Sequence, residues 1–213
     1  MLNIKTYSQL GEDLIVAGIA NMMRLKSFSY VDIGANSPIN LSNTYLFYEA
    51  GYKGVLVEPN PSCCAELKSV RPRDICLNNG IAWDKETCAD FFVMTANTLS
   101  TFSQAEVAHC LTPEAIKGWG IQKAEKVIKI QLISINEVFE KYVGGTPDFL
   151  SIDTEGMDLP ILKTICFDRF RPRIICIETN GGHVGSSHAD IVVFMKDKGY
   201  RAFADTGLNV IFI

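Results

Sequence analysis

The sequence has no excess of basic residues, no long apolar run and no Cys-x-x-Cys motif. Its 213 residues carry 24 acidic and 20 basic side chains, a formal net charge of -4. Such a chain has no electrostatic footprint for a phosphate backbone, so we predict no nucleic-acid partner. The longest uninterrupted apolar runs, such as 191–195 and 210–213, are far shorter than the roughly 20 residues that cross a bilayer. We therefore predict no membrane span.

The sequence also lacks the signals of secretion, zinc binding and dinucleotide binding. The seven cysteines are scattered without the spacing that binds zinc. The first residues show no basic segment followed by an apolar stretch, which favours a cytoplasmic location. The Gly-x-Gly-x-x-Gly fingerprint is absent, and Pro38 lies where a phosphate-binding helix start needs free N–H groups. A nicotinamide-dependent oxidoreductase is therefore a remote third hypothesis.

The composition that is present is that of an ordinary folded protein, with 47% hydrophobic and 21% charged residues. The length predicts a single domain over 1–213, with an N-terminal helical segment at about 1–28. Short apolar runs alternate with stretches of helical periodicity, which is typical of βαβ units. The segment at about 95–126 breaks this rhythm, and we expect a variable insert on the substrate side there.

We therefore predict an α/β fold with a mostly parallel sheet and helices on both of its faces. The apolar runs predict strands, and the stretches with helical periodicity predict helices. The expected strands are 30–33, 54–58, 74–78, 91–94, 127–132, 148–152, 173–178, 200–204 and 209–213. The expected helices are 44–50, one beginning near 61, 104–111, 112–117, 136–142, 159–167 and 189–198.

Polar residues follow several of these strands, where ligands bind in open α/β sheets. Gly34 would let a ligand approach the backbone closely. Glu58 follows the second strand, 24 positions beyond Gly34, where a carboxylate can accept hydrogen bonds from both ribose hydroxyls. The alternative for Glu58 is an acid that stabilises a helix N-terminus. Residues 79–81 could frame an adenine, or form an ordinary turn.

The densest polar cluster, SIDTEGMD at 151–158, directly follows a strand of the type that is buried on both faces. Asp153 and Glu155 from this cluster, with Glu178 after the next strand, could hold a substrate hydroxyl, a proton or a divalent metal. We expect Asp158 to cap the helix that follows it.

Four segments together resemble the FkbM family of S-adenosylmethionine-dependent methyltransferases. They are SQLGED at 8–13, VDIGAN at 31–36, VEPN at 57–60 and SIDTEGMD at 151–158. The resemblance runs from about 7 to 178 and implies a class I methyltransferase fold. In that Rossmann-like fold a seven-stranded sheet ends in an antiparallel strand. The pair 37–38 departs from the usual first motif.

The resemblance also implies where the cofactor, S-adenosylmethionine, would lie. The first motif would surround its methionine part, Glu58 would hold its ribose hydroxyls, and the end of the third strand would lie along its adenine. Asp153 and Glu155 would stand near the sulfonium and the substrate entrance, and the N-terminal motif would fold over the site. In full, the implied positions are Asp32, Gly34, Ala35 and Asn36; Glu58 and Pro59; Asn79, Gly80 and Ile81; Asp153 and Glu155; and Gln9, Glu12 and Asp13.

These features predict an O-methyltransferase that acts on a hydroxyl of a small molecule, such as a sugar, a glycoconjugate or a natural-product intermediate. The hydroxyl must lose its proton, so a general base is needed. The candidates are Asp153, His183 and Glu155; His183 could equally be an exposed loop residue. A variant mechanism would use magnesium held by Asp153, Glu155 and Glu178.

A non-catalytic protein that only binds S-adenosylmethionine is the second hypothesis. Substrate specificity is expected in 97–122, where Trp119 and Phe102 could stack on a sugar ring or could belong to the core. The oligomeric state is left open, with a homodimer as one option.

Overall fold

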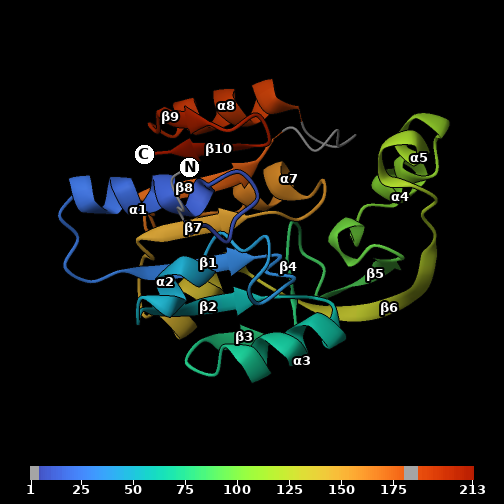
Figure 1. The fold of residues 1–213 in the computed structure, drawn as a ribbon, viewed down its shortest axis with the longest axis horizontal. Helices are drawn as coiled ribbons and strands as arrows, with labels where there is room; N and C mark the ends of the chain where they lie inside the picture. Colours follow the sequence, from blue (N-terminus) through green and yellow to red (C-terminus); the bar gives the residue numbers. More distant parts are fainter. Residues whose placement is uncertain (1–4, 180–186) are drawn as a thin grey trace.

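Seven strands form the central sheet in the computed structural model, which describes residues 5–179 and 187–213. Their order across the sheet is β3-β2-β1-β7-β8-β10-β9 (Figure 1). The first five strands in this order pair in parallel, whereas β10 runs antiparallel to both β8 and β9. The predicted α/β class and the antiparallel ending of the sheet are confirmed. The strands are β1 (Ser29–Ile33), β2 (Lys53–Val57), β3 (Ile75–Leu77), β7 (Phe149–Ile152), β8 (Ile174–Glu178), β9 (Ala202–Asp205) and β10 (Asn209–Phe212).

Helices cover both faces of this sheet, because alternate residues of each strand point to opposite sides. In β1, Tyr30 faces the layer that contains α1, α2 and α3, whereas Val31 and Ile33 face the layer of α6, α7 and α8. Strand β8 repeats this pattern, with Cys176 on the first side and Ile177 on the second. Each face therefore has its own apolar core.

The helices around the sheet are short, and none in the described part of the chain is long and apolar enough to cross a membrane. They are α1 (Glu12–Met22), α2 (Tyr45–Glu49), α3 (Pro61–Val70), α6 (Ile135–Glu137), the π-helix η2 (Val138–Val143), α7 (Asp158–Leu162) and α8 (His188–Asp197). Helix α3 begins at Pro61, and its N-cap Asn60 accepts a hydrogen bond from the Ser62 N–H at 3.1 Å. Asn60 thereby satisfies one of the free N–H groups of the first turn.

A second, three-stranded sheet lies beyond the carboxyl ends of β1 and β2 (Figure 1). Its order is β4-β6-β5, and β6 pairs in parallel with β4 and antiparallel with β5. The segment between β5 and β6 contains three short helices. These elements are β4 (Gly80–Ile81), β5 (Cys88–Met94), the 3-10 helix η1 (Asn97–Leu99), α4 (Gln104–Cys110), α5 (Pro113–Trp119) and β6 (Ala124–Ile133).

Several elements differ from their expected bounds. The strand expected at 127–132 is the longer Ala124–Ile133, and the helix expected at 136–142 is a short α-helix followed by a π-helix. The helix expected at 159–167 ends at Leu162. Here the Asn136 side chain donates to the Thr164 carbonyl and accepts from the Cys166 N–H, both at 2.8 Å. Because Asn136 satisfies these backbone groups, the chain can leave the helix early.

Candidate functional site

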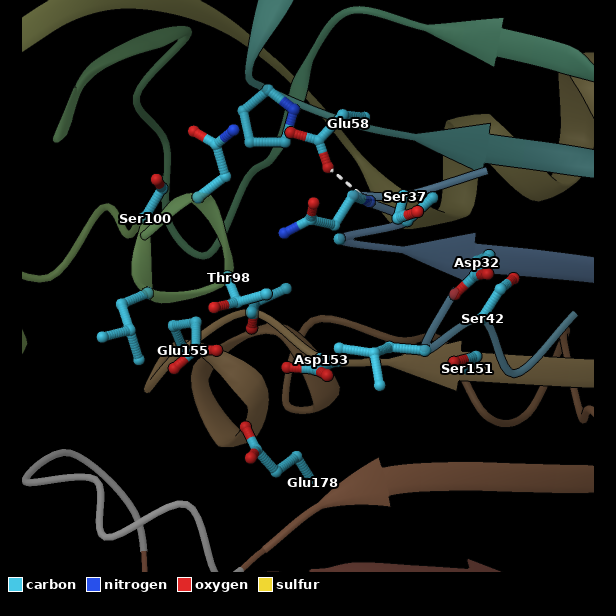
Figure 2. Close-up of a pocket in the computed structure, with 18 of the residues that line it drawn as sticks. Asp32, Ser37, Ser42, Glu58, Thr98, Ser100, Ser151, Asp153, Glu155 and Glu178 are labelled. Atoms are coloured by element: carbon cyan, nitrogen blue, oxygen red, sulfur yellow. Dashed lines mark hydrogen bonds between the residues drawn. The ribbon is translucent and has the colours of Figure 1, made fainter. Parts of the chain in front are cut away.

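A cavity of about 710 Å³ lies at the carboxyl ends of the parallel strands. Strand order reverses between β1 and β7, and open α/β sheets bind ligands at such a switch point. Figure 2 shows Asp32 from β1, Glu58 after β2, Asp153 after β7 and Glu178 from β8 around this space. Each of these side chains is therefore placed by the end of a buried strand.

Gly34 brings the end of β1 into close contact with the end of β7. Its φ is +81°, and its N–H donates to the Val57 carbonyl at 2.9 Å. A Cβ atom at this position would lie 1.8 Å from the carbonyl oxygen of Asp153. Only glycine has both the required backbone freedom and the required space, so the sequence at this turn fixes the separation of the two strand ends.

Both carboxylate oxygens of Glu58 accept hydrogen bonds from backbone N–H groups. Oε2 accepts from Asn36 at 2.8 Å, the dashed line in Figure 2, and Oε1 accepts from Asn60 at 2.7 Å. Burial raises the pKa of Glu58 to about 7, against the lowering effect of these two N–H groups. The side chain is thus held in one orientation at the cavity wall, with lone pairs left to accept further hydrogen bonds.

Asp32 also lines the cavity, but its carboxylate is tied to the loop that follows β1. Oδ2 accepts from the Thr44 hydroxyl at 2.6 Å, and Thr44 in turn accepts from Arg71 at 3.1 Å. Burial raises the pKa of Asp32, while Thr44 and the Arg71 cation lower it. Arg71 has no exposed side-chain surface and forms an ion pair with Asp74 at 2.8 Å. Sequence reasoning missed this arginine, since an arginine just after a helix is usually exposed.

Three carboxylates gather at the other end of the cavity, as Figure 2 shows. One oxygen each from Asp153, Glu155 and Glu178 lies within 4.8 Å of the others. Burial raises the pKa of Asp153 well above its usual range, and the Glu178 and Glu155 carboxylates raise it further. This acidic cluster is suited to holding a proton, a cation or a hydrogen-bond donor.

Backbone strain also gathers at this site. Among the described non-glycine residues with positive φ, Asn36 (44°), Leu41 (60°) and Glu155 (52°) all line the cavity. L-residues adopt this conformation rarely, and strained backbone concentrates at functional sites. The strain therefore supports the cavity as the functional site, independently of its carboxylates.

Asp158 has a different structural role from the expected one. It is the first residue of α7, and its carboxylate accepts from the N–H groups of Thr154 at 3.0 Å and Gly156 at 3.3 Å. It therefore stabilises the turn that precedes the helix and does not cap the first turn of the helix. By holding this turn, Asp158 fixes the backbone that carries Glu155.

The residues after the third strand are only partly at the cavity. Ile81 lines it, together with Pro59 and Ala35. Asn79 instead donates to the Gln131 carbonyl at 3.2 Å, and a Cβ atom added to Gly80 would lie 2.4 Å from the Phe102 ring. Gly80 and Ile81 thus form β4 of the second sheet. Of the three residues in 79–81, Ile81 is the one that lines the cavity.

The N-terminal motif is also divided. Gln9 lines the cavity, whereas Glu12 and Asp13 are completely buried in the fold. Glu12 accepts from Asn209 and Thr206, each at 2.9 Å, and so anchors the turn before β10. Asp13 accepts from the Tyr7 N–H at 2.8 Å. The two acids hold the segment that presents Gln9. The candidate base His183 lies outside the described residues.

The segment between β5 and β6 supplies the far wall of the cavity. Thr98, Ser100, Trp119 and Gln122 line it, within the region 97–122 expected to set specificity. Trp119 is 40% exposed, whereas Phe102 packs against Phe91 at 4.7 Å between ring centroids. Phe102 is half-buried and also lines the cavity, so both aromatic residues contribute to this wall, and Trp119 is the more exposed of the two. The loop with Asn40 and Leu41, which sequence reasoning missed, completes the lining.

The family's sequence profile, described as the methyltransferase FkbM domain, matches residues 32–202. The chain belongs to the FkbM methyltransferase family. It is accordingly a methyltransferase of the S-adenosylmethionine-dependent kind. The match begins at Asp32 and includes all four strand ends that surround the cavity. No curated protein matches the sequence.

The solved structures that are similar to this chain include the following three methyltransferases. A TehB-like SAM-dependent methyltransferase from Corynebacterium glutamicum has a TM-score of 0.49 and 10% identity, covering 99% of this chain and 89% of that one. The methyltransferase domain of bacterial CtHen1-CN has a TM-score of 0.43 and 11% identity, covering 96% and 98%. A SAM-dependent methyltransferase from Agrobacterium tumefaciens has a TM-score of 0.43 and 8% identity, covering 100% and 64%.

Proposed function

We propose that this FkbM methyltransferase transfers a methyl group from S-adenosylmethionine to a hydroxyl oxygen of a small molecule, such as a sugar, a glycoconjugate or a natural-product intermediate. The observation that carries the proposal is the separation of two acidic sites along one cavity. Glu58 lies at one end, held by two backbone N–H groups, and the cluster of Asp153, Glu155 and Glu178 lies at the other. The first suits a pair of ribose hydroxyls and the second suits a cationic sulfur and a reacting hydroxyl.

The donor set fits the cofactor along its length. Glu58 would accept hydrogen bonds from the ribose hydroxyls, and the apolar side chains of Pro59 and Ile81 would contact the adenine. Asn36 and the backbone at Gly34 would lie beside the methionine part, with Asp153 near the sulfur. All six residues line the same cavity.

When bound, S-adenosylmethionine supplies a methyl group on a positively charged sulfur, which keeps the C–S electron pair as a neutral thioether when the acceptor oxygen forms the new C–O bond. The protein must align the acceptor with that methyl group and exclude water. Asp153 takes the proton that the hydroxyl loses, a role that its raised pKa favours. The negative charges of Glu155 and Glu178 keep the pKa of Asp153 raised. Both side chains also accept hydrogen bonds from the acceptor.

Asp153→Asn is expected to lower kcat by about 100-fold or more, because the amide cannot accept the hydroxyl proton. The affinity for S-adenosylhomocysteine should change by less than about fivefold, which separates loss of the base from loss of the binding site. The measurement combines the rate of ¹³C-methyl transfer, followed by the methoxy signal of the product, with titration calorimetry. Unchanged kcat in Asp153→Asn would contradict the proposed base.

Magnesium is the alternative occupant of the acidic cluster, because three carboxylate oxygens within 4.8 Å of one another suit a hard cation. In that case Asp153, Glu155 and Glu178 would hold the ion, which would lower the pKa of the acceptor hydroxyl. Chelation then abolishes transfer, and Glu155→Gln and Glu178→Gln lose as much activity as Asp153→Asn. With Asp153 as base, a chelator has no effect and Asp153→Asn shows the largest loss.

Binding of S-adenosylhomocysteine is expected to weaken about tenfold per pH unit below pH 7, because the pKa of Glu58 is raised to about 7 by burial. The ribose hydroxyls donate to the ionised carboxylate, so the ligand selects the deprotonated form and affinity levels off above that pH. This ligand lacks the sulfonium charge, which reduces the contribution of Asp153. Calorimetry between pH 5.5 and 8 measures the profile, and Glu58→Gln should remove this slope. A flat wild-type profile contradicts the assignment.

A further inference from the structure

The charged residues that line the cavity are all acidic. They are Asp32, Glu58, Asp153, Glu155 and Glu178, and the described lining contains no lysine, arginine or histidine. The undescribed residues 1–4 and 180–186 add no lysine or arginine to the sequence, only His183. The chain as a whole has 20 lysines and arginines, so their absence from this wall distinguishes the cavity from the rest of the protein.

Two of these carboxylates belong to the cofactor end, where Glu58 binds two backbone N–H groups and Asp32 binds Thr44. The other three, Asp153, Glu155 and Glu178, gather across the cavity from Glu58 (Figure 2), at the end where the proposed function places the sulfonium and the acceptor hydroxyl.

The position of Glu155 is fixed by the fold. Its φ is +52°, and its carbonyl accepts from the Thr101 hydroxyl at 2.8 Å. Thr101 has only 1% of its surface exposed, so this bond joins the segment between β5 and β6 to the turn after β7. The fold therefore fixes the main chain from which the Glu155 carboxylate projects into the cavity.

Resting on the proposed function, we infer that the methyl acceptor carries no negative charge: it is a neutral or amino-bearing polyhydroxyl compound without phosphate, sulfate or carboxylate groups. A carboxylate cluster accepts hydrogen bonds from hydroxyl and ammonium groups and repels anions at short range. The remaining polar lining, such as Thr98 and Ser100, is uncharged, and Trp119 offers an aromatic face for a sugar-like ring. The inference thereby excludes nucleotide-linked and phosphorylated sugars as methyl acceptors.

The test begins with calorimetry on the full chain with S-adenosylhomocysteine. Absence of binding overturns the proposed function itself. With binding established, a metabolite extract of the source cells is separated on an anion-exchange resin at pH 7, and both fractions are incubated with protein and methyl-labelled S-adenosylmethionine. We expect at least tenfold more labelled product from the unretained fraction. Label confined to the retained, anionic fraction overturns the inference, and no label from either fraction overturns the proposed transfer to a small molecule.

A charge variant then tests the reason for the preference. Thr98 is exposed at the cavity wall, so Thr98→Lys adds a cation there without removing any carboxylate. With the acceptor identified, the wild type should prefer it over its phosphorylated counterpart by at least 100-fold in kcat/KM. Thr98→Lys should reduce that ratio about tenfold, whereas Thr98→Gln should not. A wild type that uses both compounds within threefold contradicts the inference.

Discussion

Gly34→Ala is expected to lower the free energy of unfolding by about 3 kcal/mol or more and to abolish cofactor binding, because it combines backbone strain with overpacking. The new Cβ would lie 1.8 Å from the Asp153 carbonyl oxygen, and backbone atoms cannot move aside as a flexible side chain can. The φ of +81° is itself unfavourable for alanine. Relief of the clash requires the ends of β1 and β7 to separate, which displaces Asp153.

Gly51→Ala is the matched control for this prediction. Gly51 has a φ of +96°, and a Cβ there would meet no atom within 4 Å, so the substitution adds strain without a clash. Its expected cost is about 1–2 kcal/mol, with unchanged binding. Denaturant unfolding and calorimetry measure both variants. If Gly34→Ala is as stable as Gly51→Ala and still binds S-adenosylhomocysteine, the claim that the ends of β1 and β7 leave no space for a Cβ atom at position 34 is wrong.

Arg71→Met is expected to lower the free energy of unfolding by about 3–5 kcal/mol, because it removes the cation from a buried ion pair. The Arg71 guanidinium has 0% exposure and donates from Nε to Asp74 at 2.8 Å. It also donates to Thr44, whose hydroxyl holds Asp32 at the cavity wall. The loss should therefore extend to cofactor affinity as well as to stability. Denaturant unfolding measures the first effect and calorimetry the second.

Two further variants separate the charge effect from a general packing defect. In Arg71→Met/Asp74→Asn the uncompensated carboxylate is gone, so at least about 1 kcal/mol of the lost stability should return. Arg73→Met removes an exposed arginine that stacks on Tyr48 at 3.9 Å, and its expected cost is below about 1 kcal/mol. Equal stability of Arg71→Met and Arg73→Met would contradict the account of this network.

The centre of the sheet could be predicted from the sequence because its inner strands are buried on both faces. Strands such as Phe149–Ile152 and Ile174–Glu178 are short apolar runs that are followed by polar residues. This pattern can be recognised without knowing which other elements pack against the strand. Helix ends were harder to predict, since they depend on distant residues. The end of α7 at Leu162 is set by Asn136, which a local pattern does not reveal.

In the candidate site, the residues that directly follow strands could be predicted from the sequence. Glu58 and Asp153 follow strands directly, so the topology alone brings them to the cavity. Glu12 and Asp13 were expected over the site, but they are buried and anchor neighbouring turns. Residues of a family motif can thus serve to hold the fold and need not contact a ligand. The wall contributed by Trp119 depends on how the segment between β5 and β6 folds back, which no local pattern specifies.

The most direct test of the account is calorimetric titration of S-adenosylmethionine into the wild type and Glu58→Gln at pH 8, where Glu58 is ionised because its pKa is about 7. Glu86→Gln, the same change at an exposed turn, is the control. We expect micromolar binding to the wild type and to Glu86→Gln, weakened at least about tenfold, or 1.4 kcal/mol, in Glu58→Gln. No binding to the wild type, or equal affinity for Glu58→Gln, would contradict the assignment of this cavity as the cofactor site.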